Sequence, residues 1–122
     1  MPSVNSLHLQ YRLWIAELNE DINVLRIFND HLTEVCRKQN HKYTMQVEAL
    51  KKRFSQMRNE LDEVKHEMHL QKMKLAAIAK SDESSPDEVA ENIQHNEVVL
   101  RYENFRKQFN DLKQEVIELE KD

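Results

Sequence analysis

Glu63, His66 and His69 have residue types and a spacing that could bind a metal ion. Glu63 and His66 form a Glu-x-x-His pattern, which helical di-iron proteins use twice, together with glutamates from other helices. Here the pattern occurs once, and the helix expected around it directs these three side chains away from its apolar side. A helical-bundle metal-binding protein using Glu63, His66 and His69 is therefore the alternative function. The main interpretation requires no metal and no other cofactor.

Tyr11, Gln71 and His95 fall on the apolar sides of three separate segments. Buried polar side chains need hydrogen-bond partners, so these three could meet in one layer of a bundle. One functional interpretation is a small-ligand or proton site. Because no carboxylate or cysteine joins them at these positions, we interpret Tyr11, Gln71 and His95 as a buried polar layer that fixes how the helices align.

Asp21 also interrupts an apolar row, at a level that places it opposite Leu61 and Phe105. An unpaired charge is costly to bury. We therefore expect the neighbouring Ile22 to turn inward and Asp21 to move to the edge of the core.

A basic cluster, Lys51, Lys52, Arg53 and Arg58, could contact phosphate groups. However, no aromatic residue interleaves with these cations on the exposed face to stack on bases, and the chain carries a net charge of -4. Residues 41–80 hold nine Lys and Arg against five Asp and Glu, whereas residues 81–122 hold five against twelve. We therefore expect the basic segment to lie beside the acidic one rather than to bind nucleic acid.

Cys36 is the single cysteine, so no disulfide can form within the chain and a cytoplasmic location is the simplest expectation. Nucleophilic catalysis would need a partnered histidine and an oxyanion site, and the sequence suggests neither. The first twenty residues lack a basic start followed by an apolar run, and no apolar stretch approaches the ~20 residues of a membrane span. We expect a protein that is neither an enzyme nor membrane-bound.

Residues 43–78 organise the rest of the chain. Their apolar positions alternate at intervals of four and three, with Gln71 as one polar member, a pattern typical of coiled-coil helices. The row consists of Tyr43, Val47, Leu50, Phe54, Met57, Leu61, Val64, Met68, Leu75 and Ile78. Similar rows run over residues 7–35 and 98–119, and glycine is absent. These patterns predict one all-α domain, an antiparallel up-down-up three-helix coiled-coil bundle over residues 1–122.

The expected helices cover about residues 6–39, 42–79 and 86–121, with a loop at 80–87. Ser85 before Pro86 is a strong helix start, because proline is favoured at the first helical position. A one-residue slip in the apolar row at residues 37–42 indicates a turn. The alternative is one continuous helix from Leu7 to Ala79, which would force the chain to dimerise.

Antiparallel packing fixes which residues face one another. Between the second and third helices the rows pair Phe54 with Leu112 and Met57 with Phe109. Between the first and second helices they pair Phe28 with Phe54. One bundle therefore accounts for all three rows.

Several apolar residues lie off these rows, all at the end that carries the amino terminus. An excess of this kind at one end indicates either wider packing there or a contact surface for another protein. The expected interaction surface consists of Leu13, Leu70, Met73, Ile93 and Leu100. We therefore expect a helical interaction or scaffold module, and a second copy of the chain, forming a homodimer, is the candidate partner.

Overall fold

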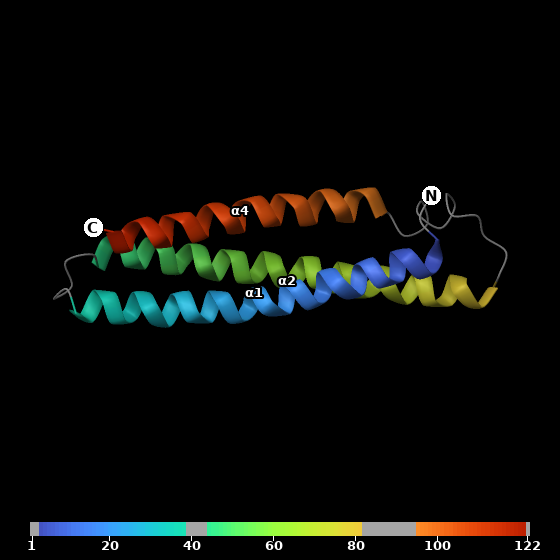
Figure 1. The fold of residues 1–122 in the computed structure, drawn as a ribbon, viewed down its shortest axis with the longest axis horizontal. Coiled ribbons are helices and arrows are strands. Elements are labelled where there is room, and N and C mark those ends of the chain that lie inside the picture. Colours follow the sequence, from blue (N-terminus) through green and yellow to red (C-terminus); the bar gives the residue numbers. More distant parts are fainter. Residues whose placement is uncertain (1–2, 39–43, 82–94, 122) are drawn as a thin grey trace.

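The computed structural model describes residues 3–38, 44–81 and 95–121. In these ranges the chain forms three helices: α1 (Val4–Lys38), α2 (Thr44–Ser81) and α4 (His95–Lys121). They lie along one long axis, with α2 antiparallel to both α1 and α4 (Figure 1). The predicted all-α, up-down-up three-helix bundle is confirmed.

The helix ends differ from expectation by about one turn or less where they are described. α1 begins at Val4 because Ser3 caps it: the Ser3 hydroxyl oxygen accepts a hydrogen bond from the Ser6 amide at 3.1 Å. α2 continues to Ser81, so the expected loop begins later than residue 80. The expected helix start at Pro86 lies outside the described residues.

The helices α1 and α2 fold back on each other, so the alternative of one continuous helix is wrong. The ring centroids of Phe28 and Phe54 lie 6.1 Å apart, which confirms the predicted pairing of these two residues. Near the end of the hairpin, the Cys36 sulfur lies 3.5 Å from the Thr44 hydroxyl oxygen. The predicted turn at residues 37–42 lies largely outside the described residues, since α1 ends at Lys38 and α2 begins at Thr44.

The core follows the apolar row of α2 along its length. Tyr43 lies outside the described residues and Ile78 is partly buried. The other members of the predicted row are buried, Gln71 included: Val47, Leu50, Phe54, Met57, Leu61, Val64, Met68 and Leu75. The coiled-coil period alone was therefore enough to predict which side of α2 is covered.

The buried side of α1 is rotated slightly from the predicted row. Ile15 is buried, whereas Trp14, which the row contains, is only partly buried. The Trp14 ring is too large for the centre and stacks on Tyr102 of α4, with centroids 5.0 Å apart. As a result, α1 uses Ile15 against the core and Trp14 to close the contact with α4.

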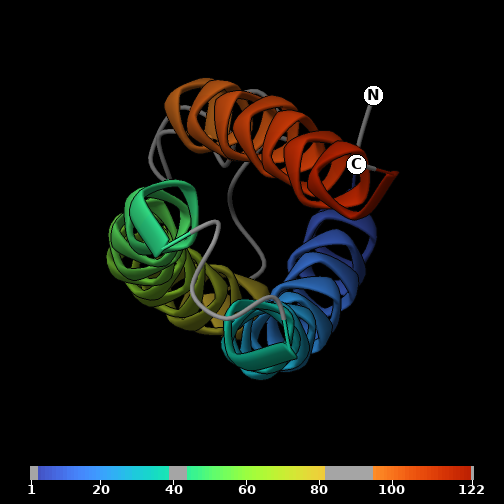
Figure 2. The ribbon, with the colours of Figure 1, turned by 90° about the vertical axis from the view of Figure 1, so that its left-hand side faces the viewer.

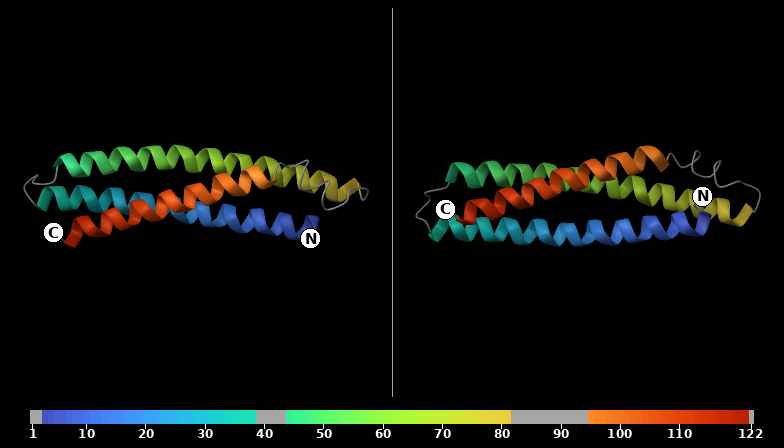
Figure 3. Two further views of the ribbon diagram at one scale, coloured as in Figure 1. Left: turned by 90° about the horizontal axis from the view of Figure 1, so that it is seen from above. Right: turned by 45° about the horizontal axis from the view of Figure 1, so that its top comes forward.

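Seen end-on, the three helices occupy the corners of a triangle around this core (Figure 2). α1 and α2 pack most closely along their length. The carboxyl end of α2 runs past the beginning of α4 and lies beside the amino end of α1 (Figure 3). Clefts lie between α1 and α2 and between α2 and α4.

Candidate functional site

A buried ion pair joins α1 to α4 inside the bundle. Asp21 is only 4% exposed, and its carboxylate contacts the Arg106 guanidinium. The expectation that Asp21 moves to the edge is wrong, because Arg106 reaches inward from α4 and supplies the charge that Asp21 requires. Ile22, expected to replace Asp21 in the core, is only partly buried.

Arg106 also connects a second carboxylate and a phenol. Its Nη1 donates a hydrogen bond to Glu17 Oε1 at 2.9 Å, and the Tyr102 hydroxyl donates to the other oxygen of Glu17. The guanidinium carbon lies 5.3 Å from the centre of the Phe109 ring, within the range of a cation–π contact. One cation thus holds two acidic side chains of α1 against α4.

Burial perturbs the protonation of both α4 members of this network. Burial lowers the pKa of Arg106, although the charge and hydrogen bond of Glu17 oppose that effect. Arginine nevertheless stays charged at neutral pH, because its ordinary pKa exceeds 12. Burial, followed by the hydrogen bond and charge of Glu17, raises the pKa of Tyr102, which keeps its hydroxyl protonated as a donor.

The sequence suggested neither Arg106 nor Glu17 as a functional residue. Arg106 follows the buried Phe105, and Glu17 stands one turn before Asp21. A glutamate and an aspartate four residues apart on a helix repel one another unless a cation approaches, which is a signal in the sequence, although Glu17 itself remains exposed in the structure. That signal was present, but it does not say which helix supplies the cation.

Two members of the predicted polar layer are in contact, and the third is directed elsewhere. The Tyr11 hydroxyl and His95 Nδ1 are 2.8 Å apart. Gln71 is buried, but its amide donates to Glu67 Oε1 at 2.8 Å, and its own oxygen has no hydrogen-bond partner among the described residues. The layer is therefore a Tyr11–His95 pair beside a separate Gln71–Glu67 pair.

The Tyr11–His95 pair is arranged to remain uncharged. Burial, followed by the charge of Glu67, raises the pKa of Tyr11, and burial lowers the pKa of His95. A protonated tyrosine can donate to an unprotonated imidazole nitrogen, so the two shifts favour the same hydrogen bond. Trp14 covers the imidazole in a nearly parallel stack, with centroids 6.3 Å apart.

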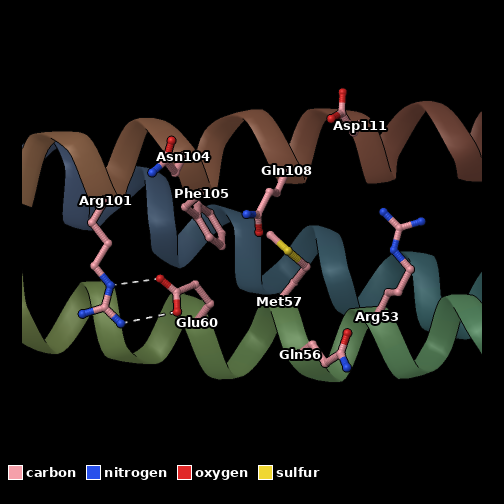
Figure 4. Close-up of a pocket in the computed structure, with 9 residues that line it drawn as sticks. All are labelled: Arg53, Gln56, Met57, Glu60, Arg101, Asn104, Phe105, Gln108 and Asp111. Carbon is pink, nitrogen blue, oxygen red and sulfur yellow. Dashed lines mark hydrogen bonds and ion pairs between the residues drawn. The ribbon is translucent and has the colours of Figure 1, made fainter.

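A polar cleft of about 490 Å³ lies between α2 and α4 (Figure 4). Met57 and Phe105 form its apolar part, and Arg53 and Arg101 stand at opposite ends. Arg101 donates to Glu60 at 2.9 Å, and Arg53 forms an ion pair with Glu115. Carboxylates of the chain itself therefore neutralise both cations, and the cleft resembles a closed set of interhelical ion pairs more than an anion site.

The three candidate metal ligands are not assembled into a site. Glu63 accepts a hydrogen bond from Arg101 at 2.6 Å, His66 is exposed and His69 is partly buried. Across residues 3–38, 44–81 and 95–121, no three His, Cys, Asp or Glu side chains are grouped as metal ligands. Glu63 is not available as a metal ligand, because Arg101 binds its carboxylate.

The basic cluster divides between two sides of α2. Arg53 meets the acidic α4 through Glu115, as expected. Lys51 instead contacts the Thr33 hydroxyl of α1, and Arg58 pairs with Asp62 on α2 itself. Only part of the basic segment therefore serves the contact with α4.

Four members of the expected interaction surface are exposed. Leu13 is 57% exposed, Met73 is 67% exposed, and Leu70 and Leu100 also face solvent. Ile93 lies outside the described residues. The surface residues come from all three helices.

None of the described helices combines the length and the apolar character needed to cross a membrane. Comparisons with models of protein families, with curated proteins and with solved structures find no match to this chain.

Proposed function

We propose that this chain is a non-enzymatic helical interaction module that associates with a second copy of itself through the end of the bundle carrying its amino terminus. The supporting observation is the distribution of exposed apolar side chains. Of eight large ones exposed in the described part of the chain, five lie toward this end: Leu9, Leu13, Leu70, Met73 and Leu100. A cytoplasmic location, which the presence of a single cysteine favours, is part of the proposal.

The energetic argument for association is the burial of these side chains. Fully burying a Leu or Met side chain contributes about 1.5–3 kcal/mol, and these side chains are 40–67% exposed, so covering them gains part of that energy. A specific dimer needs about 1,200–2,000 Å² of total buried surface, which long helices placed side by side can supply. Two-fold dimers are the commonest oligomers and require no foreign partner.

The polar groups of the core support a structural rather than a catalytic role. Asp21 is engaged by Arg106, and Tyr11 by His95. Both contacts join α1 to α4, so these side chains serve the alignment of helices. A non-enzymatic module needs such groups only to hold its surface in one shape.

Sedimentation equilibrium from micromolar to near-millimolar protein tests the proposal. We expect a concentration-dependent dimer that Leu70→Glu with Met73→Glu converts to a folded monomer. The matched control is Ile27→Glu with Met45→Glu, because these residues are as exposed but lie away from this end. A wild type that stays monomeric throughout, or a control variant that loses the dimer equally, would contradict the proposal.

A further inference from the structure

Four cations follow one another along α2 at intervals of seven residues. They are Lys51, Arg58, Lys65 and Lys72, and we call them the basic stripe. Seven residues are two helical turns, or about 10.5 Å, so the four share one side of the helix and span about 31 Å. Positions at this spacing beside the apolar row are the ones that carry interhelical ion pairs in coiled coils.

Two members of the basic stripe, Lys51 and Arg58, border α1. Lys51 and Arg58 line a groove of about 540 Å³ between α1 and α2, together with Ile22 and Phe54. In the end-on view, the edge between α1 and α2 is opposite the corner that α4 occupies (Figure 2). The acidic residues of α4 therefore lie across the bundle from this groove.

The two interfaces that α4 makes have matched charges. Between α2 and α4, Arg53 pairs with Glu115 and Arg101 pairs with Glu60. Between α1 and α4, Arg106 pairs with Glu17. At each of these interfaces a cation on one helix meets a carboxylate on the other.

The groove between α1 and α2 lacks this matching. The α1 residues that line it are Ile22, Leu25, Arg26 and Asn29, and none of them is acidic. Within the described part of the chain, Asp62 is the only carboxylate that forms an ion pair with a member of the basic stripe, at 3.2 Å from Arg58. Asp62 belongs to α2 itself, so among the described residues no carboxylate of α1 forms an ion pair with the basic stripe.

Two cations of the basic stripe contribute to lowering the pKa of a neighbouring histidine. Burial, followed by the charges of Lys72 and Lys65, lowers the pKa of His69. Arg26 adds another cation from the α1 side of the groove. The rim therefore carries cations from both helices.

The floor of the groove is apolar, and among its apolar residues Ile22 is the one that stays partly exposed. Ile22, Leu25 and Phe54 contribute to its lining, while Asn29 and Asn59 add amide groups. A groove with apolar side chains within and cations along the rim matches a helix that has an apolar row flanked by acidic residues. Phe54 is buried, so it is not placed to stack on nucleic-acid bases.

We propose that the groove between α1 and α2 binds an acidic amphipathic helix of another protein, which packs as a fourth helix and pairs its carboxylates with the basic stripe. The occupant is a helix because the cations repeat at the coiled-coil spacing and not as a compact cluster. This surface is separate from the one proposed for self-association. Either proposal can fail without the other.

A synthetic peptide about four heptads long, with Leu in its apolar row and Glu on both flanks, is the probe. Its flanks repel one another, which keeps the peptide itself from pairing. We expect its fluorescence anisotropy to rise on binding the wild-type chain, and the affinity to weaken between about 50 and 300 mM salt. Lys51→Glu with Arg58→Glu should weaken binding by about tenfold or more.

Lys52→Glu with Lys107→Glu is the matched control, since it makes the same change in net charge at exposed positions outside the groove. It should bind within about twofold of wild type. A peptide with Lys in place of Glu should bind the Lys51→Glu, Arg58→Glu variant and not the wild type. Circular dichroism checks that each variant is folded, and Leu70→Glu with Met73→Glu should keep wild-type peptide binding.

Three results would overturn the proposal. The first is no binding of the acidic peptide at near-millimolar protein, and the second is an equal loss in the control variant. The third is tighter binding of poly(U) RNA or phosphatidylserine vesicles that depends on the same two residues. That result would assign the stripe to a phosphate-bearing partner instead of a helix.

Discussion

The carboxylate of Asp21 in α1 forms an ion pair with the guanidinium of Arg106 in α4, within the core of the bundle. Taking two charges out of water is costly, and their mutual attraction repays that cost only in part. Such a pair therefore contributes little net stability, while the loss of one partner leaves the other charge buried alone. The contact specifies how α1 and α4 align more than how tightly they hold.

Removing one partner of this pair should be more harmful than removing both. We expect Asp21→Leu to lower the free energy of unfolding by about 3 kcal/mol, because Glu17 still contacts Arg106 and limits the loss. Asp21→Leu with Arg106→Leu should recover most of that loss. Urea denaturation of the two single variants and the double variant measures the coupling. A double variant no more stable than Asp21→Leu would show that the charges are not coupled.

The Tyr11–His95 contact predicts a loss of stability in mild acid. Because burial lowers the pKa of His95, protonation favours the unfolded chain. Stability is therefore complete above the unfolded pKa of about 6.5 and falls as the pH drops below it. His95→Gln should flatten the dependence of unfolding free energy between about pH 7 and pH 5.

The hydrogen bond itself can be tested through the same titration. Tyr11→Phe removes a donor that favours the neutral imidazole, so we expect the pKa of His95 to rise relative to wild type. Titration of the imidazole by NMR measures it, and His69, whose pKa is also lowered, is the internal control. An unchanged His95 titration would contradict a donor role for the Tyr11 hydroxyl.

Phe105 should be among the most sensitive positions in the core. It is buried, and its ring stacks on Phe109 with centroids 5.6 Å apart. Phe105→Ala should cost about 3–5 kcal/mol, because the ion pair beside it cannot expand into the cavity. Lys107→Ala, at an exposed neighbouring position, is the control and should change stability by less than about 0.5 kcal/mol. A loss under about 1 kcal/mol for Phe105→Ala would mean that the core adapts readily.

The pairing of α2 with α4 predicts a crosslink. Phe54 and Leu112 are both buried, and the ion pair between Arg53 and Glu115 places their helix segments side by side. Phe54→Cys with Leu112→Cys, in a Cys36→Ser background, should form a disulfide within one chain on oxidation. Non-reducing electrophoresis distinguishes it from a disulfide between chains, which would contradict the predicted register.

The apolar period was sufficient for the fold and insufficient for the polar contacts. It predicted the buried side of α2 because each buried position there holds an apolar residue or Gln71. It failed at Asp21, since Arg106 lies beside the α4 row and crosses into the core only through its long side chain. Sequence periodicity predicts only the direction of each Cβ. The position of a long arginine side chain depends also on where the facing helix places a carboxylate.

The sequence predicted the exposed apolar residues but not how the basic cluster is divided between helix faces. The sequence identified Leu13, Leu70, Met73 and Leu100 as surplus to the rows, and all four are exposed. It did not separate Arg53, which faces α4, from Lys51, which faces α1. Successive residues of a helix point about 100° apart. Residues that are close in the sequence of α2 can therefore face different neighbouring helices, α1 or α4.

The placement of the polar contacts sets an order for assembly of the bundle. Phe28 meets Phe54 across a short reversal, whereas Tyr11 and His95 are separated by 84 positions along the chain. Closing the shorter loop costs less entropy, so the α1–α2 hairpin is expected to form first and α4 to dock onto it last. Opening in the native state would follow the reverse path, and backbone amides of α4 would then exchange with solvent deuterium while the hairpin stays protected.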